Sequence, residues 1–175
     1  ADIVTKKAYR DFRLHIEFLV MNPRGNSGVY LQNRYEIQIQ DGDATHHGMG
    51  AVINETPSPY FLYKGLRQWN SYDILFRAAR FKDGKLVEKA RVTMYFNGVK
   101  IHAHQEIQQV WGGANSGIDG GNDAICPLVE LGDLGAGQDL DALLLEPLAG
   151  ERGDLGVLDR EDLRQHLNHG DLGAH

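Results

Sequence analysis

The feature that most constrains the fold is the alternation of apolar and polar residues over residues 26–41, around a turn signal at Asn33-Arg34. Successive side chains of a strand point to opposite faces of the sheet, so this pattern predicts two strands joined by a tight turn. The apolar face of the second strand consists of Tyr35, Ile37 and Ile39, and its polar face of Glu36, Gln38 and Gln40. The stretch therefore predicts a sheet with one face toward a core.

The polar face of this hairpin is the first candidate for a functional surface. Tyr30 and Gln32 of the preceding strand extend the row of hydrogen-bonding groups. Such a row on a sheet suits the recognition of sugar hydroxyls. A solvated outer face without a function is the alternative interpretation.

The rest of residues 1–123 has the same β character. An Asn97-Gly98 pair between two β runs is a strong hairpin signal, because both residues tolerate the positive φ of a type I′ turn. Residues 22–26 form a further turn signal. The predicted strands are 13–20, 69–81, 90–96 and 99–102.

Many short strands with Gly turns and no long helix in this part of the chain predict an all-β fold, a jelly-roll sandwich. The length of 175 residues favours one domain with a core of its own. The single cysteine, Cys126, excludes an internal disulfide, and no apolar run is long enough for a membrane helix. The chain begins without a signal peptide, and we expect it to be truncated at the N-terminus.

Charge and composition divide the chain at Asp123. Residues 1–123 hold 15 Lys and Arg against 13 Asp and Glu, whereas residues 124–175 hold 3 against 11. A near-neutral body argues against a nucleic-acid partner, which needs a clustered basic face. Residues 124–175 lack Phe, Trp, Tyr and Lys, so we expect an acidic disordered tail or a frameshifted segment, with helical spacing only at 155–167.

Several motifs in order along the chain resemble the 3-keto-disaccharide hydrolase domain family. They are residues 8–14, 26–41, 68–74, 76–81, 90–98 and 112–123. The resemblance implies a concanavalin- or laminin-G-like jelly roll whose concave sheet holds a sugar, and members that are usually exported in bacteria to the periplasm or beyond. It does not extend into residues 124–175, where the family has a closing strand.

The resemblance also implies the chemistry. Family members act on glycosides oxidised at C3, by hydrolysis or by elimination. This chemistry needs a general base, an acid for the leaving oxygen and a group that stabilises an enolate, a task that a divalent metal ion can perform.

The candidate catalytic residues are Glu36 and His47. The candidate substrate-binding residues are Tyr30, Arg34, Gln38, His46, Asn70, Arg77 and Asp119. Each has an ordinary structural role as its alternative: a surface carboxylate for Glu36, a solvated loop for the two histidines, a turn residue for Asp119. No metal site is assigned, although His102 and His104 have the spacing of two ligands on one strand face.

Three hypotheses follow for the chain as a whole. The first is an enzyme that cleaves the glycosidic bond of 3-keto-glycosides, with a small sugar as its substrate. The second is a carbohydrate-binding module on the same fold that performs no chemistry. The third is an inactive fragment.

Overall fold

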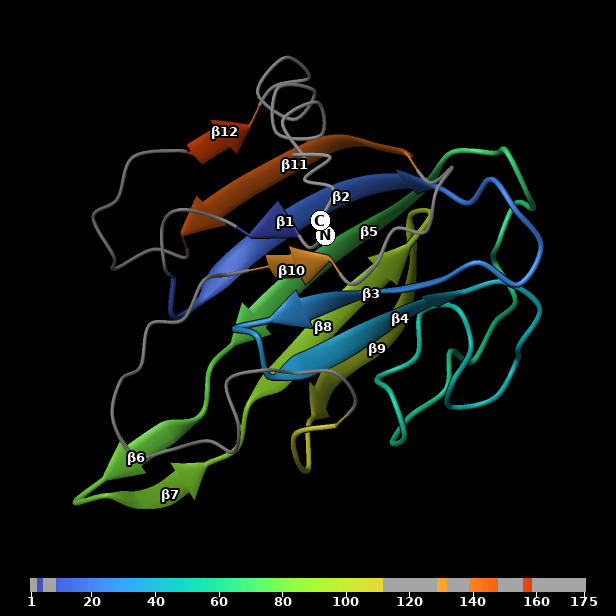
Figure 1. Cartoon of the computed structure of the whole chain (residues 1–175). Coiled ribbons are helices and arrows are strands. Elements are labelled where there is room, and N and C mark those ends of the chain that lie inside the picture. The colour runs from blue at the N-terminus through green and yellow to red at the C-terminus, as the bar shows by residue number, and fades with distance from the viewer. Residues whose placement is uncertain (1–2, 5–8, 112–128, 132–138, 148–155, 159–175) are drawn as a thin grey trace, which may run out of the picture.

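The computed structural model describes residues 3–4, 9–111, 129–131, 139–147 and 156–158 (Figure 1). Within these ranges the chain consists of strands and loops, without a helix. The strands are β1 Ile3–Val4, β2 Phe12–Leu19, β3 Asn26–Leu31, β4 Tyr35–Gln40, β5 Asn70–Arg77, β6 Arg80–Lys82, β7 Lys85–Glu88, β8 Arg91–Phe96, β9 Val99–Glu106, β10 Val129–Leu131, β11 Asp139–Pro147 and β12 Gly156–Leu158.

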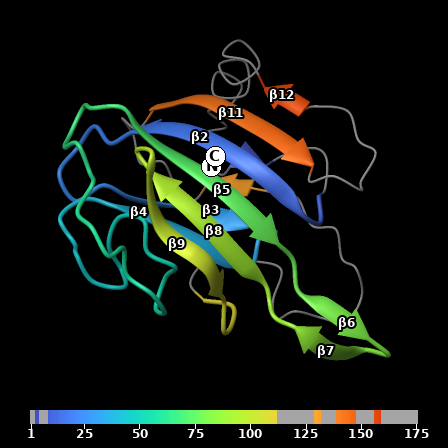
Figure 2. The ribbon, with the colours of Figure 1, turned by 180° about the vertical axis from the view of Figure 1, so that it is seen from behind.

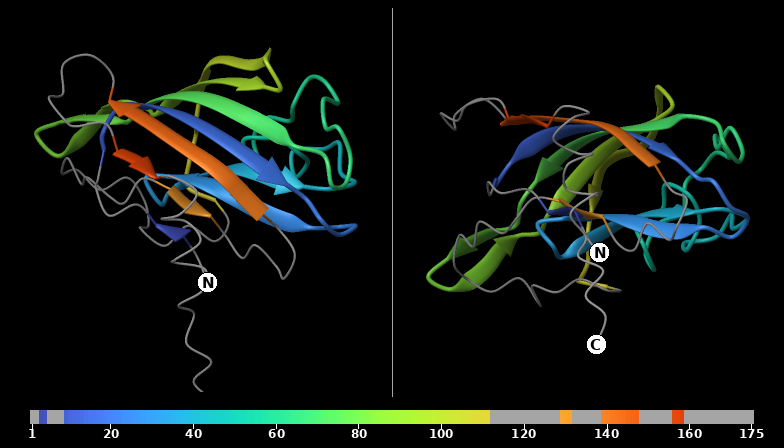
Figure 3. Two further views of the ribbon diagram at one scale, coloured as in Figure 1. Left: turned by 90° about the horizontal axis from the view of Figure 1, so that it is seen from above. Right: turned by 45° about the horizontal axis from the view of Figure 1, so that its top comes forward.

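Two antiparallel sheets stack as the layers of a sandwich (Figure 3). One has the strand order β1-β10-β3-β4, and the other, seen from behind in Figure 2, has the order β12-β11-β2-β5-β8-β9. The hairpin of β6 and β7 projects from one end of the sandwich, and the long connection between β4 and β5 lies at the other end (Figure 1). The predicted all-β jelly-roll class is confirmed.

The core lies between the two sheets and follows the alternation of the sequence. Alternate residues of β2, β5 and β8 are buried, and their neighbours are half-buried or exposed. The odd-numbered residues of β4 pack against them from the other sheet. Aromatic rings join the layers, because Tyr35 of β4 lies 5.8 Å from Phe76 of β5, measured between ring centroids.

Most predicted strands are confirmed, with two local differences. The run 69–81 breaks at Ala78, whose backbone N–H donates to the Asp11 carboxylate at 2.9 Å instead of continuing a sheet. The turn between β3 and β4 lies one residue earlier than predicted, because Gln32 and Asn33 adopt the positive φ angles. The Asn97-Gly98 turn has the predicted left-handed geometry, with φ of 47° and 81°.

The described part of residues 124–175 is strand rather than disordered chain or helix. β11 pairs with β2 from Asp139 to Pro147, and β10 lies between β1 and β3. The hydrogen-bonding needs of the backbone explain this difference. β2 pairs with β5 along one edge and β3 pairs with β4 along one edge, so the N–H and C=O groups along the other edge of each strand need partners, which β11 and β10 supply. Residues 156–158 of the predicted helical segment form β12, and its remainder lies outside the described residues. The boundary at Asp123 stays a prediction.

The described ranges contain no helix with the length and apolar character needed to cross a membrane.

Candidate functional site

The predicted polar row lies on the face of the β3–β4 hairpin that points away from the core. The register pairs Tyr30 with Glu36 and Gly28 with Gln38 across the two strands. The odd-numbered neighbours pack in the core, so these four residues share the opposite face. However, only 9% of Tyr30, 6% of Glu36 and 3% of Gln38 is exposed. The alternative of a solvated outer face is therefore wrong.

Glu36 is a buried carboxyl with a shifted pKa. Burial raises the pKa of Glu36 above its usual value, and a hydrogen bond with the Tyr30 side chain opposes part of this shift. A carboxyl with a raised pKa can accept a proton and release it again closer to neutral pH. This property is what general acid–base chemistry requires of a side chain.

Gly28 provides the space that the Glu36 side chain occupies. A Cβ atom at Gly28 would lie 2.8 Å from Cγ and 2.9 Å from Cδ of Glu36, closer than carbon atoms approach in contact. Gly28 lies inside β3 rather than in a turn. Sequence reasoning missed its role, although a glycine inside a strand is a known signal of close approach by another group.

Gln38 connects the polar row to the core and to the following loop. Its backbone carbonyl accepts a hydrogen bond from the Tyr72 hydroxyl at 2.8 Å and another from the Gly50 N–H at 2.9 Å. Its side-chain amide donates to Gln40 at 3.2 Å and accepts from the Ile39 N–H at 3.2 Å. The position of the row is thus set by both sheets of the sandwich.

His46 and His47 lie in the loop that runs back along the free edge of β4. The Ile53 N–H donates to the Glu36 carbonyl at 3.1 Å, and the adjacent Asn54 N–H donates to the His46 carbonyl at 3.0 Å. The two imidazole centroids are 4.5 Å apart, with His46 exposed and His47 half-buried. The loop therefore lies beside Glu36, while no hydrogen bond or ion pair joins Glu36 to His47 within residues 9–111.

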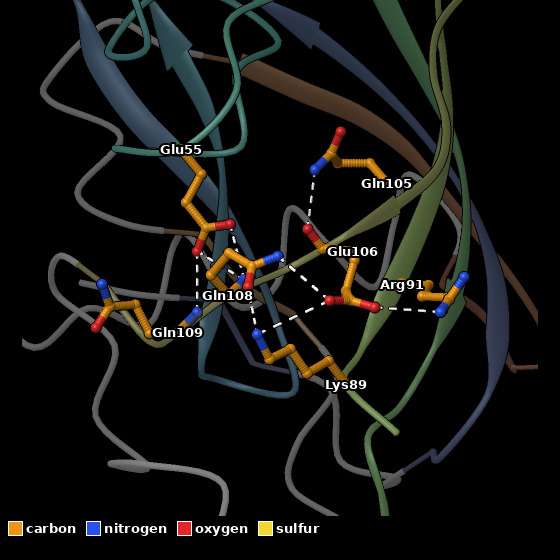
Figure 4. A network of polar contacts seen from close by, with 7 residues as sticks. All are labelled: Glu55, Lys89, Arg91, Gln105, Glu106, Gln108 and Gln109. Atoms are coloured by element: carbon orange, nitrogen blue, oxygen red, sulfur yellow. Dashed lines mark hydrogen bonds and ion pairs between the residues drawn. The ribbon is translucent and has the colours of Figure 1, made fainter. Parts of the chain in front are cut away.

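Glu55 holds the end of this loop against the segment that follows β9 (Figure 4). Its carboxylate accepts hydrogen bonds from the Gln108 N–H at 2.8 and 2.9 Å, from the Gln109 N–H at 3.0 Å and from the Trp111 indole N–H at 3.0 Å. An acidic residue in a loop carries no distinctive sequence signal, so sequence reasoning missed this clamp.

The other predicted substrate-binding residues are distributed over the molecule. Arg34 is buried just after the β3–β4 turn, next to the polar row in sequence. Asn70 is buried. Its side-chain amide oxygen accepts hydrogen bonds from the Lys64 backbone N–H at 3.1 Å and from the Asn97 side-chain amide at 2.9 Å. Arg77 is exposed on the outer face of the other sheet and pairs with Glu88 at 2.6 Å. Asp119 lies outside the described residues.

His102 and His104 do not lie on the same face of β9, although their spacing predicts this. His102 is buried and its Nε2 lies 2.8 Å from the Gly50 carbonyl oxygen, while His104 is exposed. The cause is a positive φ of 49° at His104 together with an irregular register between β8 and β9. Among the described residues, no group of three or more His, Cys, Asp or Glu side chains has the arrangement of a metal site.

Comparison with the curated proteins finds no match. Three solved structures from Parabacteroides distasonis, each named only as a candidate glycosyl hydrolase, share the fold. The first has a TM-score of 0.63 and 26% identity, covering 83% of this chain and 65% of that one. The second has a TM-score of 0.57 and 19% identity, with coverages of 84% and 76%. The third has a TM-score of 0.51 and 17% identity, with coverages of 90% and 82%.

The chain thus spans 65% of the length of the first of these structures. The other two are too distant in sequence to show more than the common fold. The sequence itself gives the more specific result, because residues 1–132 match a family described as the 3-keto-alpha-glucoside-1,2-lyase-like domain. That match includes both strands of the β3–β4 hairpin and the loop beside it, and the chain belongs to this family.

Proposed function

We propose that this chain is a carbohydrate-active enzyme that cleaves the glycosidic bond of 3-keto-glycosides, with Glu36 as the base. The observation that carries this proposal is a buried carboxyl with a raised pKa, in a polar row, with the space for its side chain provided by Gly28. Family membership supports the substrate class. The family resemblance also extends the proposal to an exported location in bacteria.

The proposed reaction begins at the carbon next to the ketone. A ketone at C3 acidifies the proton on C2, and the Glu36 carboxylate takes this proton. The electron pair of the C2–H bond forms a C1–C2 double bond, and the C1–O bond breaks with its electrons on the leaving oxygen. That oxygen takes up a proton and departs, which completes an elimination. Addition of water across the new double bond converts the same intermediate into the hydrolysis product.

Neighbouring groups supply the other parts of this chemistry. The developing enolate needs a donor or a positive charge at the C3 oxygen, and buried Arg34 and Gln38 are the candidates. His47 is the proposed proton donor to the leaving oxygen, because its loop runs alongside the strand that carries Glu36. Tyr30 orients the Glu36 carboxyl through their hydrogen bond.

Replacement of Glu36 by Gln tests the proposal. This change keeps the size of the side chain and removes its basicity, so turnover of a 3-keto-disaccharide should fall by about 10² to 10⁴, the usual contribution of a positioned base. The melting temperature should stay close to that of the wild type, because no buried charge loses a partner. Glu17→Gln is the matched control, since this carboxyl lies on the opposite sheet and 46% of its side chain is exposed.

Two outcomes would contradict the proposal. A Glu36→Gln protein that turns over at the wild-type rate removes Glu36 from the chemistry. A wild-type protein that binds a 3-keto-disaccharide saturably, without product under any condition, is a carbohydrate-binding module instead.

A further inference from the structure

The long connection between β4 and β5 lies at the end of the sandwich opposite the β6–β7 hairpin (Figure 1). Residues 43–61 of this connection line a hollow. Most connections in compact domains have about 4–6 residues, and much longer ones are commonly functional. The hollow has a volume of about 210 Å³, the space of about seven water molecules at about 30 Å³ each. This volume suits one small ring rather than a larger ligand, whose pockets begin at about 300 Å³.

Two exposed aromatic residues are among those that line the hollow. Tyr60 is 56% exposed and Phe61 is 71% exposed, and both line the hollow. Large aromatic side chains are usually buried unless they contact a partner, since each removes a large apolar area from water. The C–H groups on one face of a sugar ring form an apolar surface that can stack on such rings.

The polar residues Asp43 and Thr45 also line the hollow. The Asp43 carboxylate accepts the Thr45 N–H at 2.7 Å through one oxygen, and a carboxylate has further lone pairs. The Thr45 hydroxyl donates to the Asp43 carboxylate, and its oxygen accepts the His47 N–H at 3.2 Å. Hydrogen bonding by Thr45 lowers the pKa of Asp43, so this group is an acceptor at neutral pH. The remaining lone pairs of the Asp43 carboxylate therefore offer an acceptor to the hydroxyls of a sugar.

The backbone beside Asp43 is tightly packed. A Cβ atom at Gly48 would lie 2.8 Å from the carbonyl carbon of Asp43, so the backbone closes tightly at this glycine. Met49 is buried beside it, and the Gly50 N–H donates to the Gln38 carbonyl. The hollow is therefore attached to the strand of the proposed base through the backbone of residues 48–50.

We propose that this hollow is a second sugar subsite, which takes the ring on the leaving side of the glycosidic bond. Tyr60 and Phe61 stack on that ring, and the Asp43 carboxylate, held by Thr45, accepts hydrogen bonds from its hydroxyls. The assignment to the leaving side rests on the proposed function. The recognition of a pyranose ring by the two aromatic residues and the Asp43 carboxylate does not depend on it.

The test compares two substrates that share the reacting ring. One is a 3-keto-disaccharide, and the other is the 3-keto methyl glycoside, which lacks the second ring. Phe61→Ala and Tyr60→Ala should each raise KM for the disaccharide by about 5- to 10-fold, the loss expected for one aromatic contact. Neither change should alter kcat/KM for the methyl glycoside. Val87→Ala on the β6–β7 hairpin, with 57% exposure, is the matched control and should leave both substrates unaffected.

A binding measurement separates this proposal from the proposed function. In saturation-transfer NMR with unoxidised trehalose, the wild type should transfer magnetisation to the sugar, and Tyr60→Ala/Phe61→Ala should not. If the wild type turns over no 3-keto-glycoside but shows this transfer, the proposed function fails and the sugar subsite stands. Absence of transfer in the wild type, or equal effects of the two variants on both substrates, overturns the subsite.

Discussion

The Gly28→Ala substitution tests whether the close approach of Gly28 and Glu36 is part of the site. The added methyl group would lie 2.8 Å from Cγ and 2.9 Å from Cδ of Glu36. Carbon atoms make favourable contacts at about 3.5–4.0 Å, so the Glu36 side chain must retreat by about 0.7 Å or more. A displacement of about 1 Å at a reacting group costs on the order of 100-fold in rate. We therefore expect kcat/KM for a 3-keto-glycoside to fall by about that factor.

The same substitution should have a much smaller effect on stability. Overpacking of a filled site costs about 1–3 kcal/mol, and replacement of glycine by alanine regains about 0.4–1 kcal/mol through the unfolded state. The net loss should be about 0–2.6 kcal/mol in a denaturant titration. Most molecules thus remain folded while activity is lost.

A double-mutant cycle shows whether the clash with Glu36 is the cause. Glu36→Ala removes both Cγ and Cδ, so Gly28→Ala in that background meets no side chain there and should become neutral or stabilising by about 0.4–1 kcal/mol. If Gly28→Ala destabilises both backgrounds equally, some other contact explains its effect. Wild-type activity in the single Gly28→Ala variant would refute the positioning argument itself.

Two further predictions concern groups around the site. Glu55→Gln removes the charge that accepts hydrogen bonds from two backbone N–H groups and from the Trp111 indole, so stability should fall by about 1–2 kcal/mol and the Trp111 emission should change before global unfolding. An unchanged emission profile would contradict the proposed role of Glu55 in holding the segment that follows β9. Burial lowers the pKa of His102, so below about pH 6.5 the unfolded chain binds a proton that the folded chain does not, and stability is lost as pH falls. Denaturant titrations at pH 7.5 and 5.5 measure how much free energy of unfolding is lost between these pH values. This loss should be smaller in His102→Gln than in the wild type, by up to about 1.4 kcal/mol. An equally smaller loss in His104→Gln, which changes an exposed histidine, would contradict this origin.

The sequence predicts the parts of the fold that depend on local pattern. The alternation of residues 13–20 corresponds to β2, and the Asn97-Gly98 pair lies at the turn between β8 and β9. In both cases the signal and its structural cause lie within a few neighbouring residues. The break at Ala78 has a distant cause, since its partner Asp11 is far away in sequence. Patterns within a short window do not contain such contacts.

The candidate site follows the same distinction. Alternation places Glu36 and Gln38 on one face, and the structure confirms this arrangement. Alternation does not predict that this outward face is buried, because burial depends on segments that pack over it from elsewhere in the chain. The prediction that His102 and His104 share a strand face is wrong for a related reason. One residue with a positive φ angle is enough to interrupt the alternation of side chains between the two faces of a strand.

The buried row also explains how the fold can support a carboxyl whose charge is disfavoured. A carboxylate loses hydration when it is buried, and this cost must be offset by the folding of the remainder of the domain. The β4 strand is held independently of Glu36, because Tyr72 and Gly50 both donate to the carbonyl of Gln38 and Ile53 donates to the carbonyl of Glu36. None of these hydrogen bonds uses the Glu36 side chain, so they persist whatever the protonation state of the carboxyl. The sandwich thus fixes the backbone of the proposed base while its side chain stays free to exchange a proton.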